Sequence, residues 1–210
     1  MRQKQSLKQI IQKEYLKCVE DPIYFMKKYC QIQHPTRGRI PFHLYPFQEK
    51  SLESLADFDY NIILKSRQLG ISTLSAGYSL WLMLFHDDKN VLVIATTQEV
   101  AKNLVTKVRE MHNYLPSWLK GTTTEDNKLS LRFKNGSQIK AVSAASDAGR
   151  SEAISLLIID EAAFIEQNRI EEIWGASQQT LSTGGKAIVL STPNGTGNFF
   201  HRMWNKAEEG

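Results

Sequence analysis

Two polar segments, each following a short apolar run, hold the side chains best suited to chemistry. The first spans residues 65–73 and reads K-S-R-Q-L-G-I-S-T, and the second is the acidic pair Asp160 and Glu161, which follows S-L-L-I-I. A glycine-containing loop that opens a helix directs backbone N–H groups and a helix N-terminus at phosphate. Hydroxyl and carboxylate oxygens suit Mg²⁺, and a second carboxylate can orient a water. Together the segments predict a site for ATP hydrolysis.

The first segment departs from the standard phosphate-loop pattern G-x-x-x-x-G-K-[ST]. With Gly70 aligned to the second glycine, Ile71 occupies the lysine position and Lys65 the first glycine position. Because backbone dipoles supply only partial charge, the site still needs a cation near the β- and γ-phosphates. We expect Lys65 to supply it, with the planar guanidinium of Arg67 as a second phosphate contact. The nucleotide-binding residues expected in this loop are Lys65, Ser66, Arg67, Gln68, Leu69, Gly70, Ile71, Ser72 and Thr73.

The hydroxyl and carboxyl groups are expected to divide the remaining chemistry. Ser72 and Asp160 would hold Mg²⁺, Thr73 would support the phosphates, and Glu161 would orient or deprotonate the attacking water. Each residue also has a simpler interpretation. Serine and threonine cap helices, and acidic residues favour helix N-termini. The buried character of the preceding S-L-L-I-I run favours catalysis, because ligands of α/β sheets bind beyond the strand ends.

Four motifs and one core strand occur in the order typical of the large terminase subunits of tailed bacteriophages. The stretch at 65–73 resembles their deviant Walker A motif, and L44-Y-P-F-Q48 resembles their adenine-binding motif. V91-L-V-I-A-T-T97 is similar to the next core strand, L156-L-I-I-D-E161 to the Walker B motif, and L190-S-T-P-N-G195 to the coupling motif. The similarity covers roughly residues 40 to 205.

This resemblance implies further roles for single residues. Gln48 would read adenine with its carboxamide while Phe47 packs on the base. Ser191 and Thr192 would couple loss of the γ-phosphate to movement. Arg150 matches a position that in some members reaches a neighbouring subunit's site, so either Arg67 in cis or Arg150 in trans would be the catalytic arginine. Each residue also has an ordinary alternative, as an exposed helix glutamine, a turn or a surface arginine.

Alternating apolar runs predict an α/β fold with a mainly parallel sheet flanked by helices. Strands are expected at 62–64, 91–95, 155–159 and 187–190, and helices at 6–30 (broken near Pro22), 48–55, 72–85, 98–114 and 170–179. Asn135-Gly136 predicts an antiparallel hairpin through two positive-φ turn residues, and 34–38 a loop. The resemblance implies a P-loop NTPase of the ASCE type with a small N-terminal helical or lid subdomain. We expect a lid-associated helical region at 1–45, an ATPase core at 46–210, and no C-terminal nuclease domain.

Composition limits the other classes of function. No apolar run approaches the roughly 20 residues of a membrane span, and the N-terminus lacks a signal-peptide pattern. The two cysteines, Cys18 and Cys30, and the five histidines form no metal-ligand pattern. Residues 1–50 hold ten basic and four acidic residues, which indicates either a solvated helix face or a DNA-facing patch. With the resemblance, which implies docking on a portal, we expect a protein of the host-cell cytoplasm that is present transiently on the procapsid portal.

The resemblance implies a motor that hydrolyses ATP to drive double-stranded viral DNA into a procapsid, independently of DNA sequence. Implied partners are the portal protein, the small terminase subunit and further copies of the chain in a ring, usually of five subunits. Because the chain stops at Gly210, we expect no endonuclease activity in this polypeptide. Two alternatives stay open: a superfamily-two helicase-like translocase, and a nucleotide-binding module that docks on the portal with little turnover. The second is favoured by the missing lysine at position 71.

Overall fold

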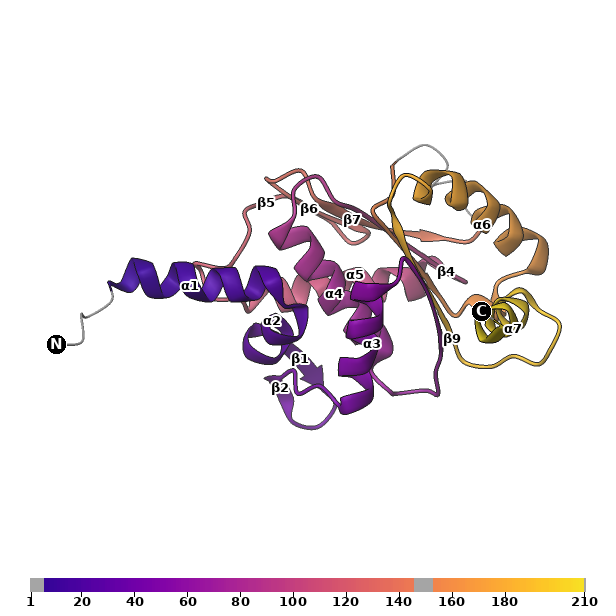
Figure 1. Cartoon of the computed structure of the whole chain (residues 1–210), viewed down its shortest axis with the longest axis horizontal. Coiled ribbons are helices and arrows are strands. Elements are labelled where there is room, and N and C mark those ends of the chain that lie inside the picture. The colour runs from indigo at the N-terminus through magenta and orange to yellow at the C-terminus, as the bar shows by residue number, and fades with distance from the viewer. Residues whose placement is uncertain (1–5, 146–152, 210) are drawn as a thin grey trace.

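The computed structural model describes residues 6–145 and 153–209 and contains a seven-stranded sheet with helices on both faces (Figure 1). The strands lie in the order β3-β9-β8-β4-β7-β6-β5. Their bounds are β3 Tyr60–Leu64, β9 Lys186–Ser191, β8 Leu156–Asp160, β4 Asn90–Ala95, β7 Gln138–Ser143, β6 Ser130–Phe133 and β5 Thr123–Asp126. The first five run parallel to one another, β6 is antiparallel to β7, and β5 at the edge is antiparallel to β6. The predicted α/β fold with a mainly parallel sheet is confirmed.

The central strands are apolar on both faces because helices cover both sides of the sheet. In β4, Val91 and Val93 pack into one hydrophobic core, whereas Leu92 and Ile94 pack into the other. This alternation follows from the two-residue period of a strand. The first core is closed by α2 (Pro22–Tyr29), α3 (Pro46–Asp57), α4 (Ile71–Phe85) and α5 (Gln98–Asn113), and the second by α6 (Gln167–Leu181) and α7 (Phe199–Glu209).

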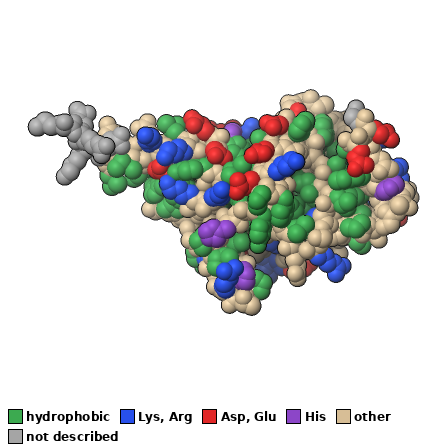
Figure 2. Space-filling view, turned by 60° about the horizontal axis from the view of Figure 1, so that its bottom comes forward, with side chains coloured by type: hydrophobic (Ala, Val, Ile, Leu, Met, Phe, Trp, Pro, Cys, Tyr) green, Lys and Arg blue, Asp and Glu red, His purple; other side chains and the backbone are tan. Residues whose placement is uncertain are grey.

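The N-terminal region comprises α1 (Leu7–Glu20), α2 and the hairpin β1 (Gln31–His34) and β2 (Gly38–Pro41). Helix α1 extends away from the body, and Figure 2 shows hydrophobic side chains at that end of the surface. The end of α1 and one face of α2 nevertheless join the first core through Cys18, Phe25 and Met26, all fully buried. The domain division at residue 45 stays a prediction.

Basic side chains of this region are partly neutralised by acidic partners. Lys17 and Lys28 both pair with Glu14, at 2.8 and 2.7 Å, and Lys27 pairs with Glu49 at 2.9 Å. These contacts, together with hydrogen bonds from Tyr24 and Tyr29, depress the pKa of Glu14 well below its usual range. The charge excess of the first fifty residues therefore includes lysines that fasten α1 and α3 to α2.

Several elements differ from the sequence-based expectation. The connection predicted at 34–38 is present as a turn, but the strands β1 and β2 that it joins, together with β5 and α7, were not predicted. Strand β5 reads T-T-E-D, a polar edge strand without the apolar alternation that marks half-buried strands. The hairpin around Asn135-Gly136 is confirmed as β6–β7, but only Gly136 has positive φ (+85°), since the connection has four residues rather than a two-residue turn.

In the described part of the chain, no helix combines the length and apolar character needed to cross a membrane.

Candidate active site

The carboxyl ends of three adjacent strands bring the two chemical segments together. Strand β9 lies between β3 and β8, so the residues that follow all three strands meet at one edge of the sheet. The backbone N–H of Lys65 donates to the carbonyl of Ser191 at 3.0 Å, which ties the start of the loop to the end of β9. Lys65 and Asp160, 95 residues apart in the chain, thus become neighbours.

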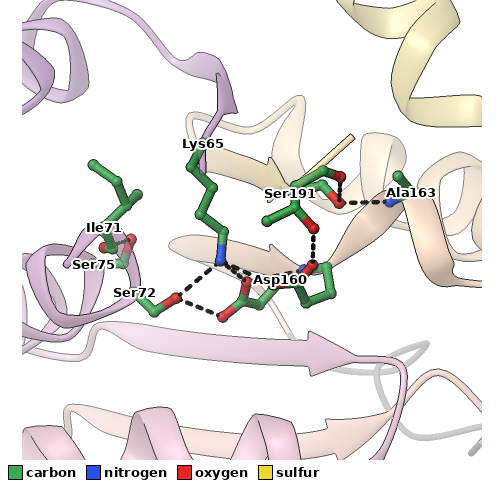
Figure 3. Close-up of polar contacts among 9 residues, drawn as sticks. Lys65, Ile71, Ser72, Ser75, Asp160, Ala163 and Ser191 are labelled. Atoms are coloured by element: carbon green, nitrogen blue, oxygen red, sulfur yellow. Dashed lines mark hydrogen bonds and ion pairs between the residues drawn. The ribbon is translucent and has the colours of Figure 1, made fainter. Parts of the chain in front are cut away.

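Lys65 is the centre of a buried polar network (Figure 3). Its Nζ lies 3.1 Å from Asp160 Oδ1 and 3.1 Å from Glu161 Oε1, and 3.4 Å from Ser72 Oγ. The hydroxyl of Ser72 donates to Asp160 Oδ2 at 2.8 Å. The side chains of Lys65 and Asp160 are only 10% and 8% exposed, so this ion pair is shielded from solvent. The cation predicted for the phosphate loop therefore faces both predicted carboxylates.

Two residues with positive φ turn the loop 65–70 into the start of α4. Gln68 and Gly70 both have positive φ, +64° and +73°, and α4 begins at Ile71. A side chain at Gly70 would meet a second obstacle, because a Cβ there would lie 2.8 Å from Gln48 Nε2. The positive φ favours glycine at this position, and a Cβ would in addition displace the Gln48 carboxamide.

Glu161 has the left-handed backbone conformation, with φ 55° and ψ 42°, where β8 ends. A residue with a Cβ adopts this region at an energetic cost, and such residues concentrate at functional sites. Three polar contacts hold the residue: Asp160 Oδ1 accepts from its N–H at 2.9 Å, Lys65 contacts one carboxylate oxygen, and Thr192 Oγ1 donates to the other at 3.1 Å. The carboxylate is thereby fixed over the strand ends.

The segment after β9 is tied to the segment after β8. The hydroxyl of Ser191 accepts from the Ala163 N–H at 3.1 Å and donates to the Thr192 carbonyl at 2.8 Å. Asn194 Nδ2 donates to the Ala163 carbonyl at 3.0 Å. Asn194 belongs to the motif that the sequence predicted to receive the coupling signal, with a simple turn as the alternative, but the sequence predicted no partner for its side chain. Of the two predicted coupling residues, Thr192 contacts Glu161 and Ser191 contacts Ala163, so both are tied to the segment after β8.

An open cleft of about 520 Å³ lies beside the loop, and neither Asp160 nor Glu161 is among its lining residues. It is bordered by the β1–β2 hairpin, the segment leading to α3 and the loop itself, including His34, Tyr45, Gln48, Gly70 and Thr73. Its walls are more apolar than polar, which suits a planar heterocycle with few directed hydrogen bonds. This cleft is the candidate position for a nucleoside.

The two residues predicted to contact adenine differ in their surroundings. Gln48 is 2% exposed, and its carboxamide is engaged on both sides by backbone groups of Tyr45 and Leu69. Phe47 stacks on Tyr45 with ring centroids 5.7 Å apart, and Tyr45 rather than Phe47 borders the cleft. No role was predicted for Tyr45, although its place directly before the Pro-Phe-Gln turn into α3 was a signal for one.

Of the two arginines predicted for catalysis, the structure describes only Arg67, which does not take part in the Lys65 network. Arg67 and its neighbour Ser66 are exposed, and neither side chain makes a hydrogen bond to any residue in the described ranges. Arg150 lies outside the described residues. Leu69 is 39% exposed, whereas Ile71 is buried in the first core as the first residue of α4. The lysine position of the standard loop is therefore filled here by a core residue.

Comparison with solved structures shows the same fold in three phage proteins. The HK97 bacteriophage large terminase is 22% identical, with a TM-score of 0.73 over 91% of this chain. The Thermus phage P74-26 large terminase ATPase domain is 22% identical, with a TM-score of 0.59 over 77% of the chain. The large terminase of a thermophilic bacteriophage, solved in complex with ADP, is 17% identical, with a TM-score of 0.62 over 79% of the chain. This chain spans 41%, 69% and 43% of those proteins, respectively.

A family model described as terminase large subunit, T4likevirus-type, N-terminal, matches residues 62–210. That range contains both chemical segments, every strand of the large sheet except the start of β3, and the segment after β9. The chain therefore belongs to the T4likevirus-type family of terminase large subunits and corresponds to their N-terminal part.

Proposed function

We propose that this chain binds and hydrolyses ATP and that hydrolysis drives double-stranded viral DNA into a procapsid. The observation that carries the proposal is the position of Lys65 Nζ, 3.1 Å from Asp160 and from Glu161, with Ser72 in the same network. A cation, a hydroxyl at the opening of a helix and two carboxylates at the end of a strand are the groups that phosphoryl transfer to water requires.

Lys65 would exchange its partners when ATP enters. Its ammonium now neutralises two carboxylates, and its long stem allows it to turn toward the β- and γ-phosphates above the loop. The N–H groups at the start of α4 would add favourable partial charges to the same phosphates. Thr73 borders the adjoining cleft and is positioned to contact the nucleotide from the helix side.

The oxygens of Ser72 and Asp160 fit a Mg²⁺ ion. The two oxygens lie 2.8 Å apart, and both are hard ligands of the kind that Mg²⁺ prefers. Both residues also contact the ammonium of Lys65, so a positive charge is already stabilised at this point. Bound there, Mg²⁺ would neutralise charge that develops on the phosphate oxygens.

Glu161 would orient the water that attacks the γ-phosphorus and accept its proton. Its carboxylate is held by Lys65 and by Thr192, so one oxygen becomes available to water when Lys65 turns to the phosphates. Thr192 would then report the state of Glu161 to the segment after β9, and Asn194 would carry that change to the Ala163 carbonyl. This is the proposed coupling step.

An arginine is expected to complete the site during turnover. Arg67 is exposed on the loop and is able to approach the γ-phosphate in cis, and Arg150 is retained as the candidate supplied in trans by a neighbouring copy. The proposed assembly is a ring of these chains, docked on a portal protein with a small terminase subunit. DNA would be held through its phosphates and not read by base.

The test is phosphate release by the purified chain, with and without double-stranded DNA. We expect ATP turnover that is lost in Lys65→Ala and kept in Lys17→Ala, which removes a lysine far from the network. Two DNA duplexes of unrelated sequence should stimulate turnover equally. ATP binding without turnover in the wild-type chain, in the presence of DNA, would favour a nucleotide-binding docking module instead.

A further inference from the structure

The buried carboxamide of Gln48 forms a bridge between α3 and the phosphate loop. Gln48 Oε1 accepts from the Tyr45 N–H at 3.0 Å, and Gln48 Nε2 donates to the Leu69 carbonyl at 2.9 Å. The side chain is 2% exposed, and it lies so close to the loop that a Cβ on Gly70 would come within 2.8 Å of Nε2 and displace the carboxamide. The bond to Leu69 joins residues 21 positions apart.

To recognise adenine, Gln48 would have to direct Oε1 and Nε2 at the base instead of at the backbone of Tyr45 and Leu69. A glutamine that recognises adenine accepts from N6 and donates to N7 through its carboxamide oxygen and nitrogen together. Both atoms are here directed at backbone groups, and near-complete burial leaves little of the side chain open to the cleft. The Leu69 carbonyl immediately precedes Gly70, whose backbone turns the loop into α4.

We infer that Gln48 is a positioning residue for the triphosphate: it fixes the loop through the Leu69 carbonyl and does not select the base. This inference rests on the proposed function of the site. Its consequence is that Gln48 contributes equally to binding of any ligand that carries the triphosphate, including one without a nucleoside. A base-reading glutamine would contribute only to ATP.

The experiment measures dissociation constants for ATP, GTP and inorganic tripolyphosphate, each with Mg²⁺, by titration calorimetry. Gln48→Met removes both hydrogen bonds without adding charge, and it should weaken all three ligands by the same factor, about tenfold. Weaker ATP binding with unchanged tripolyphosphate binding would overturn the inference in favour of base reading. Unchanged binding of all three would also overturn it.

Gln48→Glu adds a readout that a purely structural role would not produce. An ionised carboxylate keeps the acceptor for the Tyr45 N–H but repels the Leu69 carbonyl, whereas a protonated one has an O–H to donate and restores both bonds. Burial favours the protonated form, so binding relative to wild type should be about tenfold weaker near pH 8 and recover near pH 6. Gln48→Met should show no recovery, and a flat profile for Gln48→Glu would overturn the inference.

Circular dichroism and thermal unfolding establish that both variants fold. If Gln48→Met does not fold, the pH profile of Gln48→Glu still decides the matter. The wild-type titration tests the proposed function separately from the role of Gln48, because a wild-type chain that binds none of the three ligands would refute the proposed function itself.

Discussion

The two sides of the phosphate loop are built in opposite ways. On the carboxylate side, Lys65 and Asp160 are nearly buried and every charged group has a partner held at a strand end. On the cleft side, Tyr45 is 63% exposed and Phe47 is 41% exposed, and the wall is a two-stranded hairpin outside the main sheet. The loop itself, braced by Gln48, is the boundary between them.

The difference indicates where the positions of side chains must be precise for the proposed reaction. Charge that develops during phosphoryl transfer is stabilised only by groups already in position, which the parallel strand ends supply. Binding of a heterocycle needs mainly apolar area and tolerates variation in its surroundings. We therefore expect variants on the carboxylate side to change rate and stability strongly, and variants on the cleft side to change affinity modestly.

The largest effect is expected from Glu161→Gln. Removing the group that accepts a proton from the attacking water should lower ATP turnover by about 10² to 10⁴-fold, without raising the dissociation constant for ATP. Phosphate release and nucleotide titration measure the two quantities. Glu53→Gln, on the exposed surface of α3, is the control and should leave turnover unchanged. Equal losses of binding and rate would refute the assigned role.

Lys65→Met tests whether the carboxylate side is a buried ion network. Loss of the ammonium leaves Asp160 buried without its cation, so the free energy of unfolding should fall by about 3–5 kcal/mol. Lys102→Met removes a lysine paired with Glu99, whose side chain is 70% exposed, and should cost less than about 1 kcal/mol. Urea unfolding measures both. Similar losses of unfolding free energy in the two variants would contradict the view that the Lys65 network is a buried ion network.

Gly70→Ala tests the boundary between the two regions. The added Cβ must adopt positive φ and approach Gln48 Nε2, so we expect a loss of about 1–2 kcal/mol in the free energy of unfolding. Gly175→Ala, in the interior of α6 with open space around a Cβ, should instead gain about 0.5–1 kcal/mol. Thermal or urea unfolding distinguishes these opposite signs. A gain at position 70 would contradict the strained geometry.

The smallest effect is expected from Tyr45→Ala on the cleft side. Loss of the ring should weaken ATP by about three- to tenfold and leave tripolyphosphate unchanged, because the ring borders the cleft and not the phosphates. Phe58→Ala removes an aromatic residue of similar exposure, 61%, beyond the end of α3 and should affect neither ligand. Calorimetry with both ligands provides the comparison. An equal loss of tripolyphosphate binding would indicate that Tyr45 supports the phosphate loop rather than the nucleoside.

Local sequence was sufficient where a pattern repeats within a few residues. The buried strand before Asp160, the helix that begins after Gly70 and the hairpin around Gly136 were all predicted in place, since periodicity and turn chemistry are short-range properties. The polar edge strand at 123–126 has no such pattern, and it was missed for that reason.

The amino-acid sequence alone determined which groups were available: one lysine ahead of a glycine turn, a hydroxyl at the opening of a helix and two adjacent carboxylates after a buried strand. Only the tertiary structure decided how they combine. Because β9 inserts between β3 and β8, Thr192 reaches Glu161, and because α3 packs against the loop, the carboxamide of Gln48 meets the Leu69 carbonyl. These contacts depend on strand order and helix packing, which involve residues too far apart for any local pattern to encode.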